Sequence, residues 1–201
     1  MQPIYHKSSY KLNAREQNAI AYERLTKVHS IPKDRQYWTL CNSQPLDAGS
    51  EIVQMVNLGA CKKEQFHGVD RDEAIIEQNK IWHPTANWHF GDWIEVIEGY
   101  EDFNPALVYL DSTSFADHRV ALNLTVRTMF LCPRGTVLIV NAMLNDPRSS
   151  KQFDPDKLVY DLRSEVPSME LNKWDTTVSN FQYSATGRTY MISYVLYKKE
   201  N

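Results

Sequence analysis

Three aspartates each follow a short apolar or aromatic run, where a carboxylate can bind the hydroxyl or amino groups of a small molecule. They are Asp70 after Phe66-His-Gly-Val, Asp92 after Asn87-Trp-His-Phe-Gly, and Asp111 after Ala106-Leu-Val-Tyr-Leu. Ligands of open α/β sheets bind outside the carboxyl ends of the strands. The pattern therefore predicts one polar crevice shared by the three acids. The same acids could instead cap the helices that follow, because aspartate is a preferred N-cap residue.

The elements that must position these acids alternate between strands and helices. Short β-forming runs cover residues 36–40, 66–69, 88–90, 106–110 and 136–141, and helical patterns cover 50–63, 72–82, 93–98, 115–131 and 154–166. Two long strands, 174–184 and 189–198, close the chain as a hairpin around residues 185–188. A capping box at Asn13–Glu16 predicts that a first helix begins there, and Pro32 ends it. The fold class is therefore α/β, with a mostly parallel seven-stranded sheet and a C-terminal antiparallel hairpin.

Composition limits the class of protein. The chain has 201 residues and a net charge of −3, which suits one domain and argues against bulk electrostatic binding of nucleic acid. Residues 1–36 hold seven Lys/Arg against three Asp/Glu, so a basic first helix could contact a nucleic acid or another anionic partner, or could simply be solvated. No apolar run is long enough for a membrane span. The start lacks a secretory signal and the three cysteines are scattered, so we expect a cytoplasmic location.

The order of elements, together with the three acids, resembles the class I methyltransferases, the Rossmann-like family that uses S-adenosylmethionine. The resemblance covers roughly residues 36–199. It implies a Rossmann-like three-layer sandwich over residues 36–201, with residues 1–35 as a basic helical segment packed on it. S-adenosylmethionine is the cofactor that the resemblance implies.

The resemblance also implies roles for the acids. Asp70 would hold the ribose hydroxyls of the cofactor, with Arg71 beside it, and a carboxylate is suited to accept two hydrogen bonds from a diol. Asp92 would receive the adenine amino group, and Trp93 would cover the ring. Asp111 and Ser112 would lie beside the transferring methyl group as the catalytic positions.

The first cofactor motif departs from the family. The family has an acid and a glycine-rich turn after its first strand, where the backbone approaches the amino-acid part of the cofactor. Here residues 36–40 run into a long loop, and the candidate contacts of that loop are Cys41, Asn42, Asp47 and Gly49. Pro45 argues against a strand that reaches Asp47.

The sequence lacks the motifs of other enzyme classes. The chain has no Gly-x-Ser-x-Gly elbow for a hydrolase and no Gly-x-Gly-x-x-Gly turn for a nicotinamide enzyme. His83 and His89 lack further zinc ligands nearby, so we expect no metal. The residues Asp111-Ser-Thr-Ser114 also differ from the Asn/Asp-Pro-Pro-aromatic tetrad of enzymes that methylate a base amino group.

Two hypotheses remain. The first is a methyltransferase of unknown acceptor, in which catalysis depends on proximity and alignment of the acceptor with the methyl group. The second is a non-catalytic binding or assembly protein, such as a viral subunit, that keeps the fold but has lost the glycine-rich loop. Binding of S-adenosylmethionine separates the two hypotheses.

Overall fold

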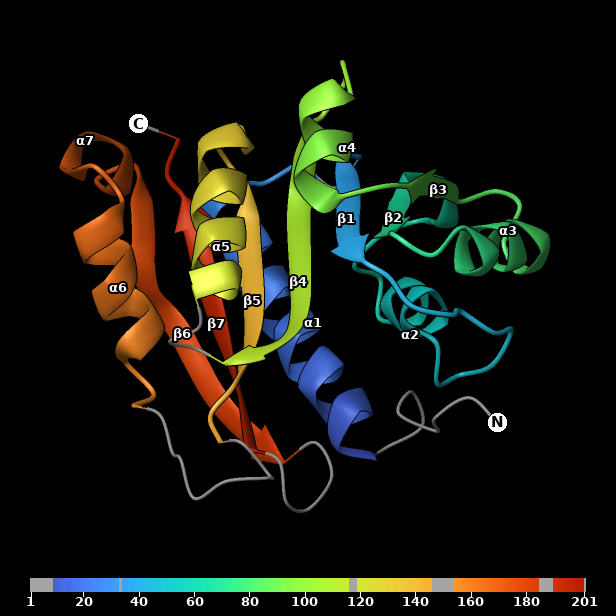
Figure 1. Ribbon diagram of the computed structural model, residues 1–201, viewed down its shortest axis with the longest axis horizontal. Coiled ribbons are helices and arrows are strands. Elements are labelled where there is room, and N and C mark those ends of the chain that lie inside the picture. The colour runs from blue at the N-terminus through green and yellow to red at the C-terminus, as the bar shows by residue number, and fades with distance from the viewer. Residues whose placement is uncertain (1–8, 33, 116–118, 146–153, 185–189, 201) are drawn as a thin grey trace.

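Runs rich in aromatic and β-branched residues form seven strands of one sheet in the part of the chain that the structure describes. This computed structural model describes residues 9–32, 34–115, 119–145, 154–184 and 190–200. The strands are β1 (Gln36–Leu40), β2 (Phe66–Asp70), β3 (Asn87–Phe90), β4 (Pro105–Phe115), β5 (Val137–Met143), β6 (Trp174–Ser184) and β7 (Tyr190–Lys198). Their order across the sheet is β3-β2-β1-β4-β5-β7-β6 (Figure 1).

The sheet is mostly parallel. Strands β1 to β5 run in one direction, and β7 is inserted antiparallel between β5 and β6. This confirms the predicted α/β fold class with its C-terminal antiparallel hairpin.

Helices cover both faces of the sheet and complete a three-layer sandwich. They are α1 (Ser9–His29), α2 (Glu51–Asn57), α3 (Glu73–Trp82), α4 (Trp93–Gly99), α5 (Arg119–Leu131), α6 (Lys157–Glu165) and α7 (Ser168–Leu171), with a short 3-10 turn, η2 (Lys63–Gln65). Helices α1, α2 and α3 share one core with the sheet, and α4, α5 and α6 share the other. In Figure 1, α5 and α6 lie in front of the sheet and α1 lies behind it.

Helix α1 packs on the sheet with a face that is only partly apolar. Ala19, Tyr22 and Leu25 belong to the core of that face, yet Arg15 and Asn18 are equally buried. The amide oxygen of Asn18 accepts a hydrogen bond of 2.8 Å from the hydroxyl of Ser193 in β7. The first helix is therefore hydrogen-bonded to β7, the last strand in chain order.

Several element boundaries differ from the prediction; α5, for example, begins at Arg119 rather than at residue 115. Helix α1 begins at Ser9, so Asn13 lies inside the helix and does not cap it. Helix α2 ends at Asn57 rather than near residue 63, because Gly59 takes a φ of +72° that terminates the helix. Strand β4 continues to Phe115, five residues beyond the predicted end at 110.

In the part of the chain that the structure describes, the helices lack the combination of length and hydropathy that a membrane crossing needs.

Candidate functional site

The carboxyl ends of β2, β1 and β4 are neighbours in the sheet, so residues that follow these strands share one edge. The chain reverses its direction of winding between β1 and β4, because α2 follows β1 on one face and α5 follows β4 on the other. Crevices at such switch points are the usual ligand sites of open α/β sheets. This edge carries the candidate site.

The loop after β1, residues 41–50, is fastened to α3. The Oδ1 atom of Asn79 accepts a hydrogen bond from the backbone nitrogen of Gln44 at 2.8 Å, and its Nδ2 donates to the carbonyl oxygen of Asn42 at 3.0 Å. The Nε2 atom of His83 lies 2.8 Å from the carbonyl oxygen of Gln44. The path of the loop is therefore fixed by side chains of a neighbouring helix and not by glycines.

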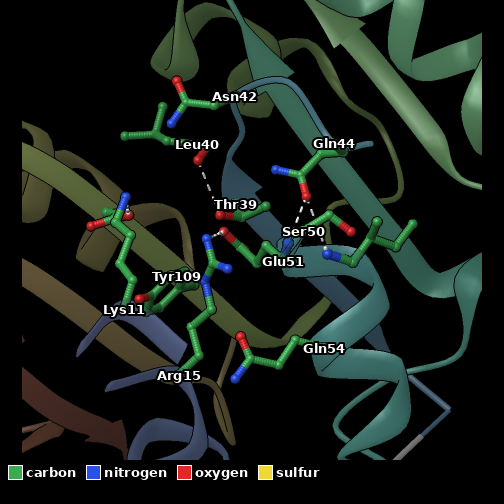
Figure 2. Close-up of polar contacts among 12 residues, drawn as sticks. Lys11, Arg15, Thr39, Leu40, Asn42, Gln44, Ser50, Glu51, Gln54 and Tyr109 are labelled. Carbon is green, nitrogen blue, oxygen red and sulfur yellow. Dashed lines mark hydrogen bonds and ion pairs between the residues drawn. The ribbon is translucent and has the colours of Figure 1, made fainter. Parts of the chain in front are cut away.

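The side chain of Gln44 caps α2. Its Oε1 accepts hydrogen bonds from the backbone nitrogens of Glu51, at 2.7 Å, and Ile52, at 3.2 Å (Figure 2). The Ser50 hydroxyl oxygen accepts the next amide, that of Val53, at 3.4 Å, so Ser50 is the N-cap of α2. Free amides at the start of a helix can bind an anionic group. In this protein the first three amides of α2 are occupied by its own side chains.

The predicted loop residues Asp47 and Gly49 also bond within the protein. Oδ1 of Asp47 accepts the backbone N–H of Gly49 at 2.8 Å. The carbonyl oxygen of Gly49 accepts a hydrogen bond of 3.0 Å from Nη1 of Arg15 in α1. Both residues thus maintain the loop, and α1 contributes directly to it.

Beneath the loop lies a buried network that the sequence did not predict. Glu51 is 2% exposed, and it accepts a hydrogen bond of 2.7 Å from the Tyr37 hydroxyl. Nη2 of Arg15 lies 3.8 Å from its other carboxylate oxygen. Burial raises the pKa of the Glu51 carboxyl, although Arg15 opposes this change. A signal was present in the sequence, since Arg15 and Asn18 precede Tyr22 at helical spacing on the face that Tyr22 and Leu25 mark as buried.

Asp111 lies within β4 and not at its end, which corrects the prediction that it follows the strand. Its Oδ2 is 2.8 Å from Nζ of Lys11, and its Oδ1 accepts a hydrogen bond of 3.2 Å from Nδ2 of Asn141. Burial alone would raise the pKa of Asp111, but Lys11 holds the pKa below its ordinary value. Figure 2 shows Lys11 and Arg15 reaching from one helix toward this edge of the sheet. Asp111 is therefore an ionised, internally paired carboxylate.

Asp70 ends β2, as predicted, and it differs from the other acids at this edge. One carboxylate oxygen accepts the backbone N–H of Asp72 at 2.8 Å, and Asp72, not Asp70, is the N-cap of α3. Among the described residues, no lysine, arginine or histidine forms an ion pair with Asp70. Burial raises the pKa of the Asp70 carboxyl above its ordinary value. A partly buried carboxylate without a counter-charge is a candidate for ligand binding.

Asp92 caps the helix that follows it, as the alternative interpretation of the three acids predicted. Its Oδ1 accepts the backbone N–H of Ile94 at 3.0 Å and caps α4. Its Oδ2 pairs with the guanidinium of Arg71, the residue after Asp70. The Arg71 side chain is 79% exposed. Arg71 therefore connects the ends of β2 and β3 through a surface ion pair.

Two predicted contacts have side chains that belong to the core. Trp93 is 2% exposed, and its Nε1 donates a hydrogen bond of 2.9 Å to the hydroxyl of Thr128 in α5. Cys41 is 4% exposed, and burial raises the pKa of its thiol well above the ordinary value. The ring of Trp93 and the thiol of Cys41 are thus occupied by packing. The side chain of Ser112 lies outside the described residues.

The predicted acids therefore form two groups and not one. Asp70 and Asp92 lie at the ends of β2 and β3 and are linked through Arg71. Asp111 lies two strands from Asp70, across β1, and faces α1. Within the described ranges, no three histidine, cysteine or acidic side chains gather to hold a metal ion.

Comparisons with known proteins find similarity in structure but not in sequence. No protein-family model and no curated protein matches the sequence. TrmN from Thermus thermophilus matches with a TM-score of 0.56 and 11% identity, over 90% of this chain and 48% of TrmN. A putative rRNA-methylase from Clostridium thermocellum matches with a TM-score of 0.52 and 10% identity, over 88% of this chain and 95% of that one. A geranyl diphosphate methyltransferase, solved with GPP and sinefungin, matches with a TM-score of 0.55 and 10% identity, over 90% of this chain and 77% of that one.

The chain has the fold of a class I methyltransferase. The Rossmann-like architecture that the sequence suggested is confirmed by these neighbours and by the strand order. Identities this low establish the fold alone. The chain spans about half the length of TrmN, 48% of it.

The methyltransferase fold puts the loop after β1 where the family has its glycine-rich turn, and here this protein is unusual. Gln44 fills the start of α2, and Asn79 holds Gln44 in place. Sequence reasoning noticed that glycines were missing but did not predict what replaces them. The sequence holds no signal for the pair that replaces them, Gln44 in the loop and Asn79 on α3, because their burial follows from the fold.

Proposed function

We propose that this protein is an S-adenosylmethionine-dependent methyltransferase that binds the nucleoside of its cofactor at the ends of β2 and β3. The observation that carries the proposal is the carboxylate of Asp70. Glu51, Asp92 and Asp111 at this edge are each paired with a cation, whereas Asp70 has no such partner among the described residues. The fold of the structural neighbours supports the same function.

The ribose is the proposed partner of Asp70. A carboxylate at the end of β2 can accept two hydrogen bonds from a vicinal diol, and such charge-assisted bonds are worth about 1.5–3 kcal/mol each. Burial raises the pKa of Asp70, so the ionised form is poorly solvated before a ligand arrives. Hydroxyl donors from a ribose would replace the missing solvation.

The adenine is the proposed partner of Asp92 and Arg71. Their ion pair has an arginine that is 79% exposed, and pairs of this kind contribute about 0–1 kcal/mol. A ligand can therefore displace the guanidinium at little cost. The freed guanidinium can stack on the face of a purine ring, a role we had expected of Trp93.

The methyl group would be transferred near Asp111 and Ser112, beside the loop residues Asn42 and Gly49. Such a reaction requires an acceptor aligned with the sulfonium methyl, and it requires little acid–base help. Asp111 is already ionised through Lys11 and would orient a donor group of the acceptor.

Calorimetric titration with S-adenosylmethionine and S-adenosylhomocysteine tests the proposal. We expect saturable binding by the native protein, and Asp70→Ala should weaken it at least about tenfold, because two charge-assisted bonds are lost. Glu73→Ala is the matched control, since Glu73 is an exposed acid three residues away in the first turn of α3. Absence of binding by the native protein, or equal binding by both variants, contradicts the proposal.

A second candidate is a non-catalytic protein of the same fold. The observation that favours it is the cap of α2, because Gln44 occupies amides of Glu51 and Ile52 at the cofactor edge. This candidate predicts that neither cofactor form binds. Binding of an anionic partner by α1 is a separate hypothesis. Helix α1 offers fewer cations to such a partner than the sequence suggested, because Lys11 and Arg15 point inward.

A further inference from the structure

We infer that the site recognises the nucleoside end of its ligand and makes few productive contacts with the amino-acid end. The inference rests on the proposed function and narrows its ligand class to adenine nucleosides and their 5′-thioethers. It predicts that 5′-methylthioadenosine binds about as well as S-adenosylhomocysteine.

The backbone amides at the start of α2, where an anionic group could bind, are already bonded. Oε1 of Gln44 accepts the amides of Glu51 and Ile52, and Ser50 accepts that of Val53. The amide of Gly49, just before the helix, donates to Asp47. An amino-acid carboxylate at the start of α2 would have to break bonds that are made inside the protein.

Gln44 is held too firmly to move aside. It is 1% exposed, its backbone nitrogen donates to Asn79, and its carbonyl oxygen lies 2.8 Å from Nε2 of His83. Moving its side chain would leave two buried amides without a partner, at a cost of about 1–3 kcal/mol for each. The cap is thus a lasting part of the folded protein.

The cations at this edge are also committed. Arg15 is 1% exposed, and its guanidinium donates to Gly49 and lies beside Glu51. Lys11 is paired at 2.8 Å with the buried carboxylate of Asp111. A carboxylate ligand that took either cation would leave a buried acid without its counter-charge, which is strongly unfavourable.

The groups that would bind the nucleoside end of the ligand are held less firmly by the rest of the protein. Asp70 lacks a cationic partner among the described residues, and the only ion pair to be opened is Arg71–Asp92, whose arginine is largely exposed. Opening a surface pair costs much less than uncapping a buried helix start. The binding free energy therefore comes mainly from ribose and base.

The experiment compares S-adenosylhomocysteine, 5′-methylthioadenosine and adenosine by calorimetric titration of the full chain. We expect the Kd of methylthioadenosine to lie within about fivefold of that of S-adenosylhomocysteine, a small difference on the affinity scale. Asp70→Asn, which keeps the size of the side chain, should weaken both ligands by the same factor. Asp70→Asn with unequal losses would overturn the inference.

The remaining outcomes separate the inference from the proposed function. If S-adenosylhomocysteine binds and methylthioadenosine is more than about fivefold weaker, the inference is wrong and the proposed function survives. If no ligand binds to protein that unfolds cooperatively on heating, the proposed function fails and the inference fails with it.

Discussion

The ammonium group of Lys11 lies 2.8 Å from Oδ2 of Asp111 and joins the first turns of α1 to β4. The acid is 6% exposed and the lysine 18%, so the pair is largely shielded from water. Asn141 adds a hydrogen bond to the other carboxylate oxygen. This pair explains why a charged residue stands inside a strand directly after the buried Leu110, and it makes α1 a part of the candidate site.

Replacing Lys11 by methionine should destabilise the protein by about 1–3 kcal/mol, because it removes the cation that is paired with the buried Asp111 carboxylate. The expected value lies below that of a fully buried pair because Lys11 keeps some exposure. The matched control is Lys27→Met, which removes an exposed pair with Glu23 and should change the free energy of unfolding by less than about 0.5 kcal/mol. Urea unfolding measures both, and equal values for the two variants would show that the Lys11 pair has no special role.

Ligand affinity should fall when the pH is lowered through the pKa of Asp70. That pKa is raised by burial, so the loss should begin at a higher pH than for an ordinary aspartate. Asp70→Asn should bind weakly with no such pH dependence. It should also make the ligand-free protein more stable at neutral pH, because the ionised form is the one that folding disfavours. Titrations and thermal melts from about pH 4.5 to 8 test both effects, and a pH-independent native affinity would contradict the assignment of Asp70.

His67 should make the protein less stable in mild acid. Burial lowers its pKa to about 3, with a smaller contribution from His89, whose Nε2 is 3.1 Å from Nδ1 of His67. The unfolded chain therefore binds more protons than the folded one, so stability is complete above the ordinary pKa of 6.5 and is lost as the pH falls toward 3. We expect a loss of about 2 kcal/mol between pH 7 and pH 5 from this residue.

The test of this residue is His67→Phe, which keeps a ring to stack on Trp38 but cannot titrate. Its free energy of unfolding should decline less between pH 7 and pH 5 than that of the native protein. Identical slopes for the two proteins would rule out His67 as the source.

Lys198→Met should cost about 2–4 kcal/mol, because this buried ammonium group satisfies the end of α5. Its Nζ donates to the carbonyl oxygens of Met129, at 3.0 Å, and Cys132, at 2.8 Å, and it pairs with Glu170. Lys173→Met is the control: Lys173 contacts the same glutamate but is 42% exposed, so its loss should cost less than about 0.5 kcal/mol. A Lys198 variant as stable as the Lys173 variant would contradict the cap.

Much of the fold follows from local patterns in the sequence. Gln36–Leu40 and Trp174–Ser184 are strands with the predicted bounds, because aromatic and β-branched runs there are bordered by clear turn residues. Prediction from the sequence fails where partners that are distant along the chain determine the extent of an element. Strand β4 passes through Asp111 because Lys11 and Asn141 satisfy an acid that, taken alone, resembles the end of a strand.

The candidate site was harder to predict than the fold. Asp70 was placed correctly at the end of β2, since a strand that ends in an acid is a local feature. The role of Gln44 depends on two partners. The start of α2 is nearby along the chain, whereas Asn79 is 35 residues away. Loop residues with ordinary polar side chains gave no sign of such a cap, because several arrangements could satisfy them equally well.

The hydrogen bond between Asn18 and Ser193 has a consequence for how the protein is made. Helix α1 leaves the ribosome well before β7, so for most of translation it lacks the part of its docking surface that β7 provides. Arg15 and Lys11 can reach their acids only after that helix docks, and contacts this distant along the chain form slowly. The nascent chain should therefore complete the candidate site as one of its last steps, when β7 has been inserted beside β5.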